Sequence, residues 1–105
     1  MTIMQGDQYP ISFALKDKAG NILTPTQIAD IEYIIGSYVY QYTDGDITYS
    51  DGKYQVMLTQ QITSELPVGV MYQQIRVKFA GADEWVRGVR LDNIKVIHSR
   101  SKVVL

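Results

Sequence analysis

The chain has 105 residues, of which 46% are apolar and 20% are charged, a composition typical of one globular domain spanning residues 1–105. It has no cysteine, which excludes disulfides, thiolate metal ligands and cysteine nucleophiles. No window approaches the roughly 20 consecutive apolar residues of a membrane span, and residues 1–7 lack the basic and apolar regions of a signal peptide. We therefore expect a soluble protein with no membrane partner.

The net charge of −1 conceals an asymmetry along the chain. Residues 1–65 carry 3 Lys or Arg against 8 Asp or Glu, whereas residues 66–105 carry 7 against 3. If the two halves formed different faces, one surface would be acidic and another basic, which would favour head-to-tail contact between copies. If strands of the two halves interleave, the asymmetry averages out.

Apolar and polar residues alternate with a period of two in the first part of the chain, as they do in half-buried strands. Residues 9–16 predict a first strand that begins at a sheet edge, because Pro10 has no amide proton. Residues 17–21 supply turn chemistry, and residues 24–27 predict a short helical start with a capping box. A second strand is predicted from about residue 30 to residue 35.

Three tyrosines follow at a spacing of two in a strand predicted over residues 37–43. Tyr38, Tyr40 and Tyr42 therefore share one face of that strand. Because tyrosine is favoured at protein interfaces, this row is the first candidate for a contact surface. The alternative is that the three rings pack within the sheet.

The remainder of the chain continues the pattern of short strands between turns. Residues 47–49 and 54–58 predict strands separated by turn residues, and Thr59 predicts the cap of a brief helical turn ending near residue 65. Further strands are predicted at 70–79, 84–91 and 94–97, with turns at 81–83 and 92–93. Turn signals about every 8–12 residues predict an all-β, immunoglobulin-like antiparallel β-sandwich of about seven strands, with one or two short helical turns.

Residues 64–72 resemble the corner at which an immunoglobulin-like chain crosses between its sheets. In such a corner a tyrosine hydrogen-bonds back to the preceding turn, and Tyr72 occupies the matching position. Tyr72 shares parity with Gln74, whereas Ile75 belongs to the evident core face. Both Tyr72 and Ile75 can therefore point inward only if a bulge falls near residues 73–74.

The turn and strand segments of the chain include Gly6-Asp7, Tyr9-Pro10-Ile11, residues 17–21, residues 51–54, Leu58-Thr59, residues 76–79 and residues 101–105. Together they resemble small proteins encoded by prophages and tailed phages of low-GC Gram-positive bacteria. They are also similar, more loosely, to the immunoglobulin-like N-terminal module of phage baseplate upper proteins. The resemblance implies a virion-associated, tail or assembly protein, located in the virion or the bacterial cytoplasm, with no catalytic residues to transfer.

No catalytic, cofactor or metal signature is present in the sequence. His98 is the single histidine and lacks recognisable nucleophile and acid partners. Asp44, Asp46 and Asp51 are the best candidates for oxygen ligands, but their spacing does not match a calcium-binding EF-hand loop. No glycine-rich phosphate loop occurs. We therefore expect no enzyme activity, no metal and no cofactor.

Basic residues in the second half form the next candidate contact surface. Arg76 and Lys78 share one strand face, which Arg87 and Arg90 are expected to extend across the neighbouring strand. Nucleic-acid binding is not expected, because the isoelectric point is about 5.7. Trp85 is a further candidate for the interaction surface, with burial in the core as its alternative.

These expectations together predict a non-enzymatic structural or adaptor protein of a phage particle or its assembly pathway. Its partners would be other phage structural proteins or copies of itself, bound through sheet edges and the tyrosine-bearing face. Residues 101–105 would either add to another subunit's sheet edge or complete the domain's own last strand. The alternative function is a carbohydrate-binding or host-surface-binding module, because aromatic rows can stack on the sugar rings of a glycan.

Overall fold

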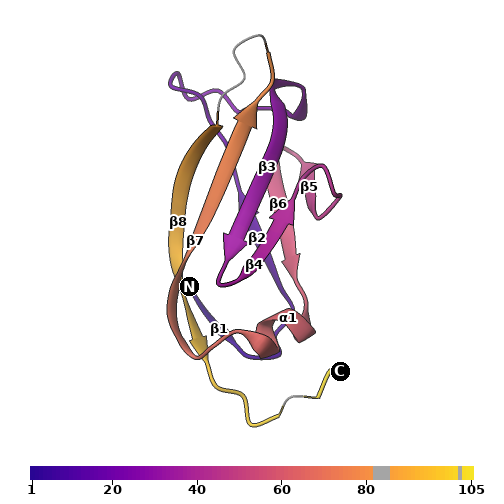
Figure 1. Ribbon diagram of the computed structural model, residues 1–105, viewed down its shortest axis with the longest axis vertical. Coiled ribbons are helices and arrows are strands. Elements are labelled where there is room, and N and C mark those ends of the chain that lie inside the picture. The colour runs from indigo at the N-terminus through magenta and orange to yellow at the C-terminus, as the bar shows by residue number, and fades with distance from the viewer. Residues whose placement is uncertain (82–85, 102) are drawn as a thin grey trace.

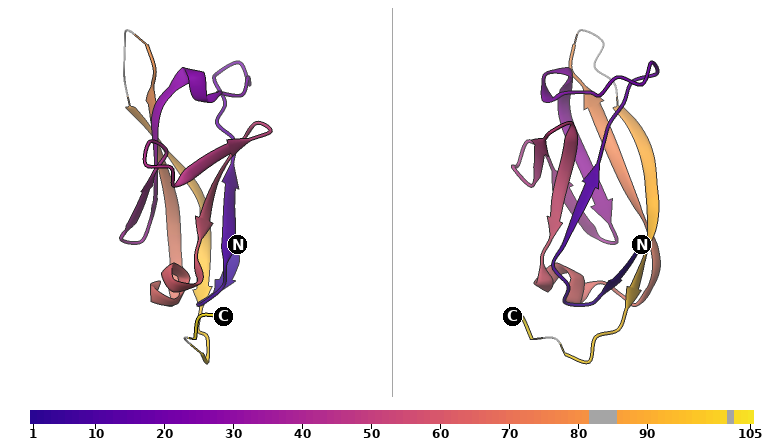
Figure 2. Two further views of the ribbon diagram at one scale, coloured as in Figure 1. Left: turned by 90° about the vertical axis from the view of Figure 1, so that its right-hand side faces the viewer. Right: turned by 180° about the vertical axis from the view of Figure 1, so that it is seen from behind.

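The computed structural model describes residues 1–81, 86–101 and 103–105 of the chain. Two β-sheets pack face to face in an elongated molecule with extents of 50 × 23 × 23 Å (Figure 1). The two layers are seen edge-on in Figure 2, left. The five-stranded sheet has the order β1 (Thr2–Met4), β8 (Val86–Ile97), β7 (Gly69–Phe79), β3 (Ile28–Ile35) and β4 (Tyr38–Gln41). The three-stranded sheet has the order β2 (Tyr9–Phe13), β6 (Lys53–Leu58) and β5 (Ile47–Ser50).

This strand order is that of an immunoglobulin-like sandwich, in which strands B, E and D form one sheet and strands G, F, C and C′ lie in the other. The predicted fold class is therefore confirmed. Two short helices, the 3-10 helix η1 (Pro25–Gln27) and the α-helix α1 (Gln60–Glu65), accompany the strands. Both begin as predicted: the Thr24 amide donates to Oε1 of Gln27, and the Ile62 amide donates to Oγ1 of Thr59.

The first strand, β1, was not predicted, and its pairing departs from an all-antiparallel arrangement. It runs parallel to β8, with Thr2 opposite Lys95 and Met4 opposite Ile97. Its three residues are too few to show an alternating pattern, and a single buried side chain, Ile3, fixes it against the core.

The predicted turn at residues 92–93 is wrong, because β8 continues through it. The pairing of β7 with β8 shifts between Tyr72 opposite Asn93 and Gln74 opposite Arg90. Two steps along β7 thus match three steps along β8, so the extra residue of a β-bulge lies in β8. The polar residues that suggested a turn are tolerated because a bulge, like a turn, interrupts the regular ladder of hydrogen bonds.

The hairpin between β5 and β6 follows the predicted turn chemistry. Asp51 and Gly52 form its two-residue loop with φ angles of 51° and 79°. Two successive positive φ values are those of a type I′ turn, whose twist matches that of the flanking strands. Asp51 is the one non-glycine residue with a positive φ among the described residues.

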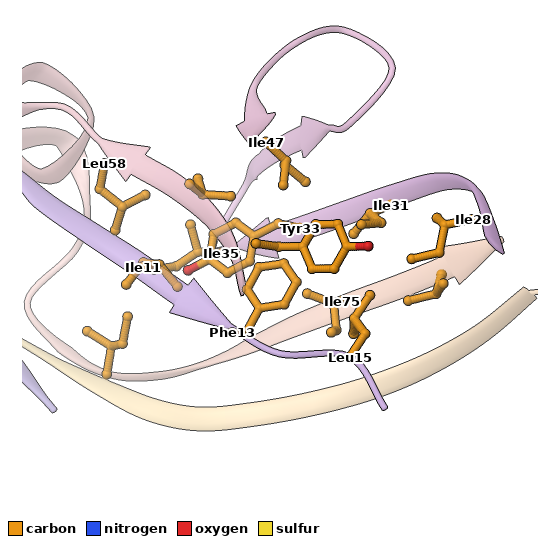
Figure 3. Packing of buried hydrophobic residues seen from close by; sticks show 14 of the residues in the cluster. Ile11, Phe13, Leu15, Ile28, Ile31, Tyr33, Ile35, Ile47, Leu58 and Ile75 are labelled. Atoms are coloured by element: carbon orange, nitrogen blue, oxygen red, sulfur yellow. The ribbon is translucent and has the colours of Figure 1, made fainter. Parts of the chain in front are cut away.

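The core lies between the two sheets and is built from aliphatic side chains around two buried tyrosines (Figure 3). Tyr33 of β3 and Tyr54 of β6 are fully buried, and both hydroxyls are satisfied. Tyr54 donates a 2.8 Å hydrogen bond to the Leu23 carbonyl, and Tyr33 donates to Gln73. Labelled members of the core in Figure 3 include Ile11, Phe13, Leu15, Ile28, Ile31, Ile35, Ile47, Leu58 and Ile75.

The predicted role of Tyr72 at the corner is wrong. Tyr72 lies on the outward side of β7 and is 53% exposed, because the bulge falls in β8 and leaves the parity of β7 unchanged. The corner is held instead by the N-terminal segment. The side-chain amide of Gln5 donates to the Leu66 carbonyl at 2.7 Å, and the Thr63 hydroxyl donates to the Asp7 carbonyl at 2.7 Å.

Candidate functional site

The predicted tyrosine row lies on the inward side of β4, at the margin of the core. Tyr40 is paired with the buried Tyr33, and Tyr38 with the buried Ile35, so their rings face the three-stranded sheet. All three tyrosines of the row are half-buried and pack against the core. The structure thus brings Tyr38, Tyr40 and Tyr42 together, but it places them inside the sheet margin and not on the outer surface.

Two hydroxyls of this row have distinct surroundings. The Tyr38 hydroxyl donates to the Glu65 carboxylate, and this bond is the main cause that raises the pKa of Tyr38 above its usual value. The hydroxyl of Tyr40 is buried and has no hydrogen-bond partner among the described residues. Burial raises the pKa of Tyr40, and the nearby negative charge of Asp46 adds to the effect.

The predicted basic group is divided between the two faces of the five-stranded sheet. Here the outer face means the side turned away from the three-stranded sheet. Arg76, Lys78 and Arg90 lie on the outer face. Arg87 is paired with the buried Val77 and therefore lies on the opposite face, so the expected extension through Arg87 does not form. Trp85, the remaining predicted contact residue, lies outside the described residues.

The outer face also carries an apolar patch that the sequence reasoning missed. This patch comprises Ile34 of β3, Val39 of β4, and Val70 and Tyr72 of β7. Val70 is 67% exposed, Val39 54% and Tyr72 53%. Ile34, Val70 and Tyr72 line a shallow hollow of about 340 Å³. The sequences of β3 and β7 could have indicated this patch. Each strand carries apolar residues on both of its faces and not only on the face that points to the core.

Tyr72 is held in place on the outer face by Arg90. The Arg90 guanidinium lies 4.4 Å from the centroid of the Tyr72 ring, a cation–π arrangement, and Nη2 of Arg90 donates to Oδ1 of Asn93 at 3.0 Å. The bulge in β8 lies between Arg90 and Asn93. Arg90 is opposite Gln74 on β7 and is therefore diagonal to Tyr72, which is opposite Asn93. The aromatic ring is therefore presented in a fixed orientation.

Charges of both signs border the apolar patch. Nε of Arg76 lies 2.9 Å from Oε1 of Glu32, which is directly opposite it on β3. Asp30 and Lys78 are likewise directly opposite each other, two residues further along each strand. Strands from the acidic first half and the basic second half of the chain thus interleave on this face. The charge asymmetry along the chain therefore averages out here and does not give one acidic and one basic surface.

The residues examined for catalysis and metal binding lie apart from these surfaces. His98 is exposed beyond the end of β8. Asp46 accepts a 3.4 Å hydrogen bond from the Gln41 amide, and Asp51 occupies the hairpin turn. Within residues 1–81, 86–101 and 103–105, no group of three or more His, Cys, Asp or Glu residues is arranged to hold a metal ion.

Comparisons of the chain with protein-family models, with curated proteins and with solved structures found no match. In the described part of the chain, no helix has the length and apolar character needed to cross a membrane.

Proposed function

We propose that this protein is a non-enzymatic association module that binds other protein subunits through the outer face of its five-stranded sheet. Its place would be in a phage particle or in the assembly of one. The subunits would be other structural proteins of the particle or further copies of this chain. The observation that carries the proposal is the apolar patch of Ile34, Val39, Val70 and Tyr72 on the outer face, with charged residues at its border.

The apolar patch has the composition expected of the centre of a protein interface. Val70, Val39 and Tyr72 each expose more than half of their surface. Clusters of exposed apolar side chains with a polar border are typical of interaction sites, and aromatic residues are enriched at interface centres. The fixed ring of Tyr72 would lose little conformational entropy on binding.

The charged border would orient a partner. The pairs Glu32 with Arg76 and Asp30 with Lys78 alternate in sign across neighbouring strands. Such a border gives an interface its register and excludes partners whose charges do not match, while it contributes little to affinity.

The particle context rests on the resemblance of the turn and strand segments to prophage and tailed-phage proteins. Small modules of a particle act by fitting together, which requires complementary surfaces and no catalytic group. The outer face supplies such a surface.

The test is a measurement of mass by light scattering behind size exclusion, over about a hundredfold range of protein concentration and at two salt concentrations. The variant Val70→Lys places a charge in the apolar patch. Its matched control is Val68→Lys, because Val68 is similarly exposed, at 57%, but lies before β7 and outside the sheet. Self-association that is lost in Val70→Lys and kept in Val68→Lys supports the proposal.

A strict monomer at every concentration would exclude copies of the chain as the partner. The same pair of variants is then tested by co-expression with the structural proteins encoded by neighbouring genes. A complex that tolerates Val70→Lys as well as Val68→Lys contradicts the role of the outer face.

The glycan-binding alternative stays a prediction and has less support. It requires exposed aromatic rings, whereas the rings of Tyr38, Tyr40 and Tyr42 are half-buried and Arg90 covers one face of Tyr72. Retention on immobilised glycans that is lost in Tyr40→Ala would favour it over protein association.

A further inference from the structure

A second surface, separate from the outer face, combines an open strand edge with an apolar groove. β1 pairs with β8 only at residues 95–97 of β8. Along residues 86–93, no described strand pairs with the edge of β8 that faces away from β7. An open edge presents unpaired backbone N–H and C=O groups, which can accept a further strand. In Figure 1 this part of β8 forms the lateral margin of the molecule, above β1.

The space beside this open edge, on the inner side of the sheet, is an apolar groove of about 640 Å³. Val77, Phe79 and Val89 line it on the side of the five-stranded sheet. Leu15 and Leu23, from the segment between β2 and η1, line the opposite side. Val89 is paired with the buried Ile75 and so faces the core side, yet it is 41% exposed. The reason is that β2 ends at Phe13 and the chain then leaves the three-stranded sheet, so this end of β8 is not covered (Figure 2, right).

The rim of the groove carries a positive charge. Lys16 and Lys18 line one side and Arg87 the other, and no ion pair of theirs is present among the described residues. Asp17, the one acid among the described residues of the rim, uses its Oδ1 atom to accept hydrogen bonds from the amides of Ala19 and Asn21, both at 2.9 Å. Asp17 therefore organises its own loop and does not reach Lys16 or Lys18 in an ion pair.

We propose that this groove binds an extended, acidic segment of a partner protein by β-strand addition to residues 86–93 of β8. The added strand pairs with the open edge, and every second side chain of it enters the groove. An apolar side chain among these packs on Val89. Asp or Glu side chains at the other inward positions meet Lys16, Lys18 and Arg87, which line the same side of the sheet. The site uses the inner side of β8, so it does not depend on the outer face proposed above.

Charge decides between this occupant and a second copy of the chain. The segment at residues 99–105 is partly apolar, and its residues 100, 101 and 103–105 are exposed, but its sequence carries Arg100 and Lys102. Those two cations would meet Lys16, Lys18 and Arg87. Like charges in contact oppose this arrangement, which favours an acidic segment from a different protein.

The probe for this site is a blocked eight-residue peptide with the repeat Val-Thr-Glu-Thr, which places valine and glutamate on one face of an extended strand. It is compared with a peptide in which lysine replaces each glutamate. Binding is followed by fluorescence anisotropy of the labelled peptide and by the amide chemical shifts of the protein. The glutamate peptide should shift the amides of residues 86–93 and bind at least about tenfold more tightly than the lysine peptide. Charge reversal in Arg87→Glu should reduce or invert that preference.

The matched variants are Val89→Lys and Val86→Lys, two equal substitutions on opposite faces of one strand. Val89 faces the groove, whereas Val86 is opposite Lys78 on the outer face, and both side chains are exposed. Val89→Lys should weaken binding of the glutamate peptide about tenfold or more, and Val86→Lys less than about twofold. The amide spectra of both variants report that they remain folded.

Three results would overturn the proposal. The first is that neither peptide binds at concentrations up to millimolar. The second is that the glutamate peptide binds as well to Val89→Lys as to Val86→Lys. The third is that the amides of residues 86–93 shift with protein concentration alone, which would identify a second copy as the occupant. None of these results bears on Val70→Lys, so this inference and the proposed function can fail separately.

Discussion

The hydroxyl of Tyr33 donates a 2.6 Å hydrogen bond to Oε1 of Gln73 inside the core. The side-chain amide of Gln73 in turn donates to the Asp92 carbonyl, at 2.9 Å, where β8 bulges. Gln73 is 2% exposed, and both ends of its side chain are satisfied. One buried amide thus links the interior tyrosine of β3 to the irregular backbone of β8.

Replacement of that amide should destabilise the fold. Gln73→Leu keeps a side chain of similar size but leaves the Tyr33 hydroxyl and the Asp92 carbonyl without this partner, so we expect a loss of about 1–3 kcal/mol in the free energy of unfolding. Urea denaturation measures it. Gln74→Leu, on the opposite face of β7, is the control and should change the free energy by about 0.5 kcal/mol or less. Equal stability of the two variants would contradict this account of Gln73.

Alkaline pH should weaken the fold through Tyr54. Burial raises the pKa of Tyr54 from 10 to about 12, with the neighbouring Tyr49 and Tyr42 adding to the shift. The unfolded chain releases this proton near pH 10, whereas the folded chain holds it until about pH 12. The stabilisation is therefore complete below pH 10 and is lost as the pH rises to 12, by about 2–3 kcal/mol in total.

The measurement is urea unfolding between pH 9 and pH 12 for the parent protein and for Tyr54→Phe. The variant should be less stable at neutral pH, because the Leu23 carbonyl loses its donor, and its stability should fall less steeply with pH. Part of the slope should remain, because burial also raises the pKa of Tyr33 above its usual value. Identical slopes for the two proteins would show that Tyr54 does not titrate as stated.

The corner beside α1 should depend on one hydroxyl. Oγ1 of Thr63 accepts a hydrogen bond from the Gly6 amide at 3.0 Å and donates to the Asp7 carbonyl at 2.7 Å. Thr63→Val preserves the shape and removes both bonds, so we expect a loss of about 1–2 kcal/mol. Hydrogen exchange of the Gly6 amide should accelerate more than that of amides in β3. The exposed neighbour Gln61, changed to alanine, is the control and should leave Gly6 exchange unaltered.

The contact between Tyr72 and Arg90 should have a measurable coupling energy. A double-mutant cycle with Tyr72→Leu and Arg90→Met isolates it, and the expected value is about 0.5–1 kcal/mol for an exposed cation–π pair. The same cycle with Arg76→Met in place of Arg90→Met should give a coupling near zero, because Arg76 is paired with Glu32. A null result for Arg90 would mean that the Tyr72 ring is not fixed in solution.

Local chemistry made several elements predictable. The two turn residues Asp51 and Gly52 fixed the hairpin of β5 and β6, and the caps at Thr24 and Thr59 marked the two helices. Each of these turn and cap patterns involves only two to four neighbouring residues, so it can be recognised in the sequence without knowledge of what packs nearby. The period-two pattern of Ile31, Tyr33 and Ile35 likewise identified the buried face of β3.

Features that depend on pairing between distant segments were not predictable. The bulge in β8 is defined only by its register against β7, and it decides which face Arg87 and Arg90 occupy. Tyr72 fits the corner by its sequence position, yet its direction is set by the same register. The groove beside Val89 arises where β2 stops covering β8, which no property of either strand reveals alone.

The parallel pairing of β1 with β8 has a consequence for synthesis of the protein. Thr2 is opposite Lys95, so the five-stranded sheet cannot be completed until nearly the whole chain described here has left the ribosome. During translation, Ile3 and the strand that carries it have no partner, and the central strand β3 must also wait for β7. Folds dominated by such distant contacts form slowly. The nascent chain therefore remains incompletely folded through most of its elongation, and its unpaired strands are exposed to premature association with other copies on the same messenger RNA.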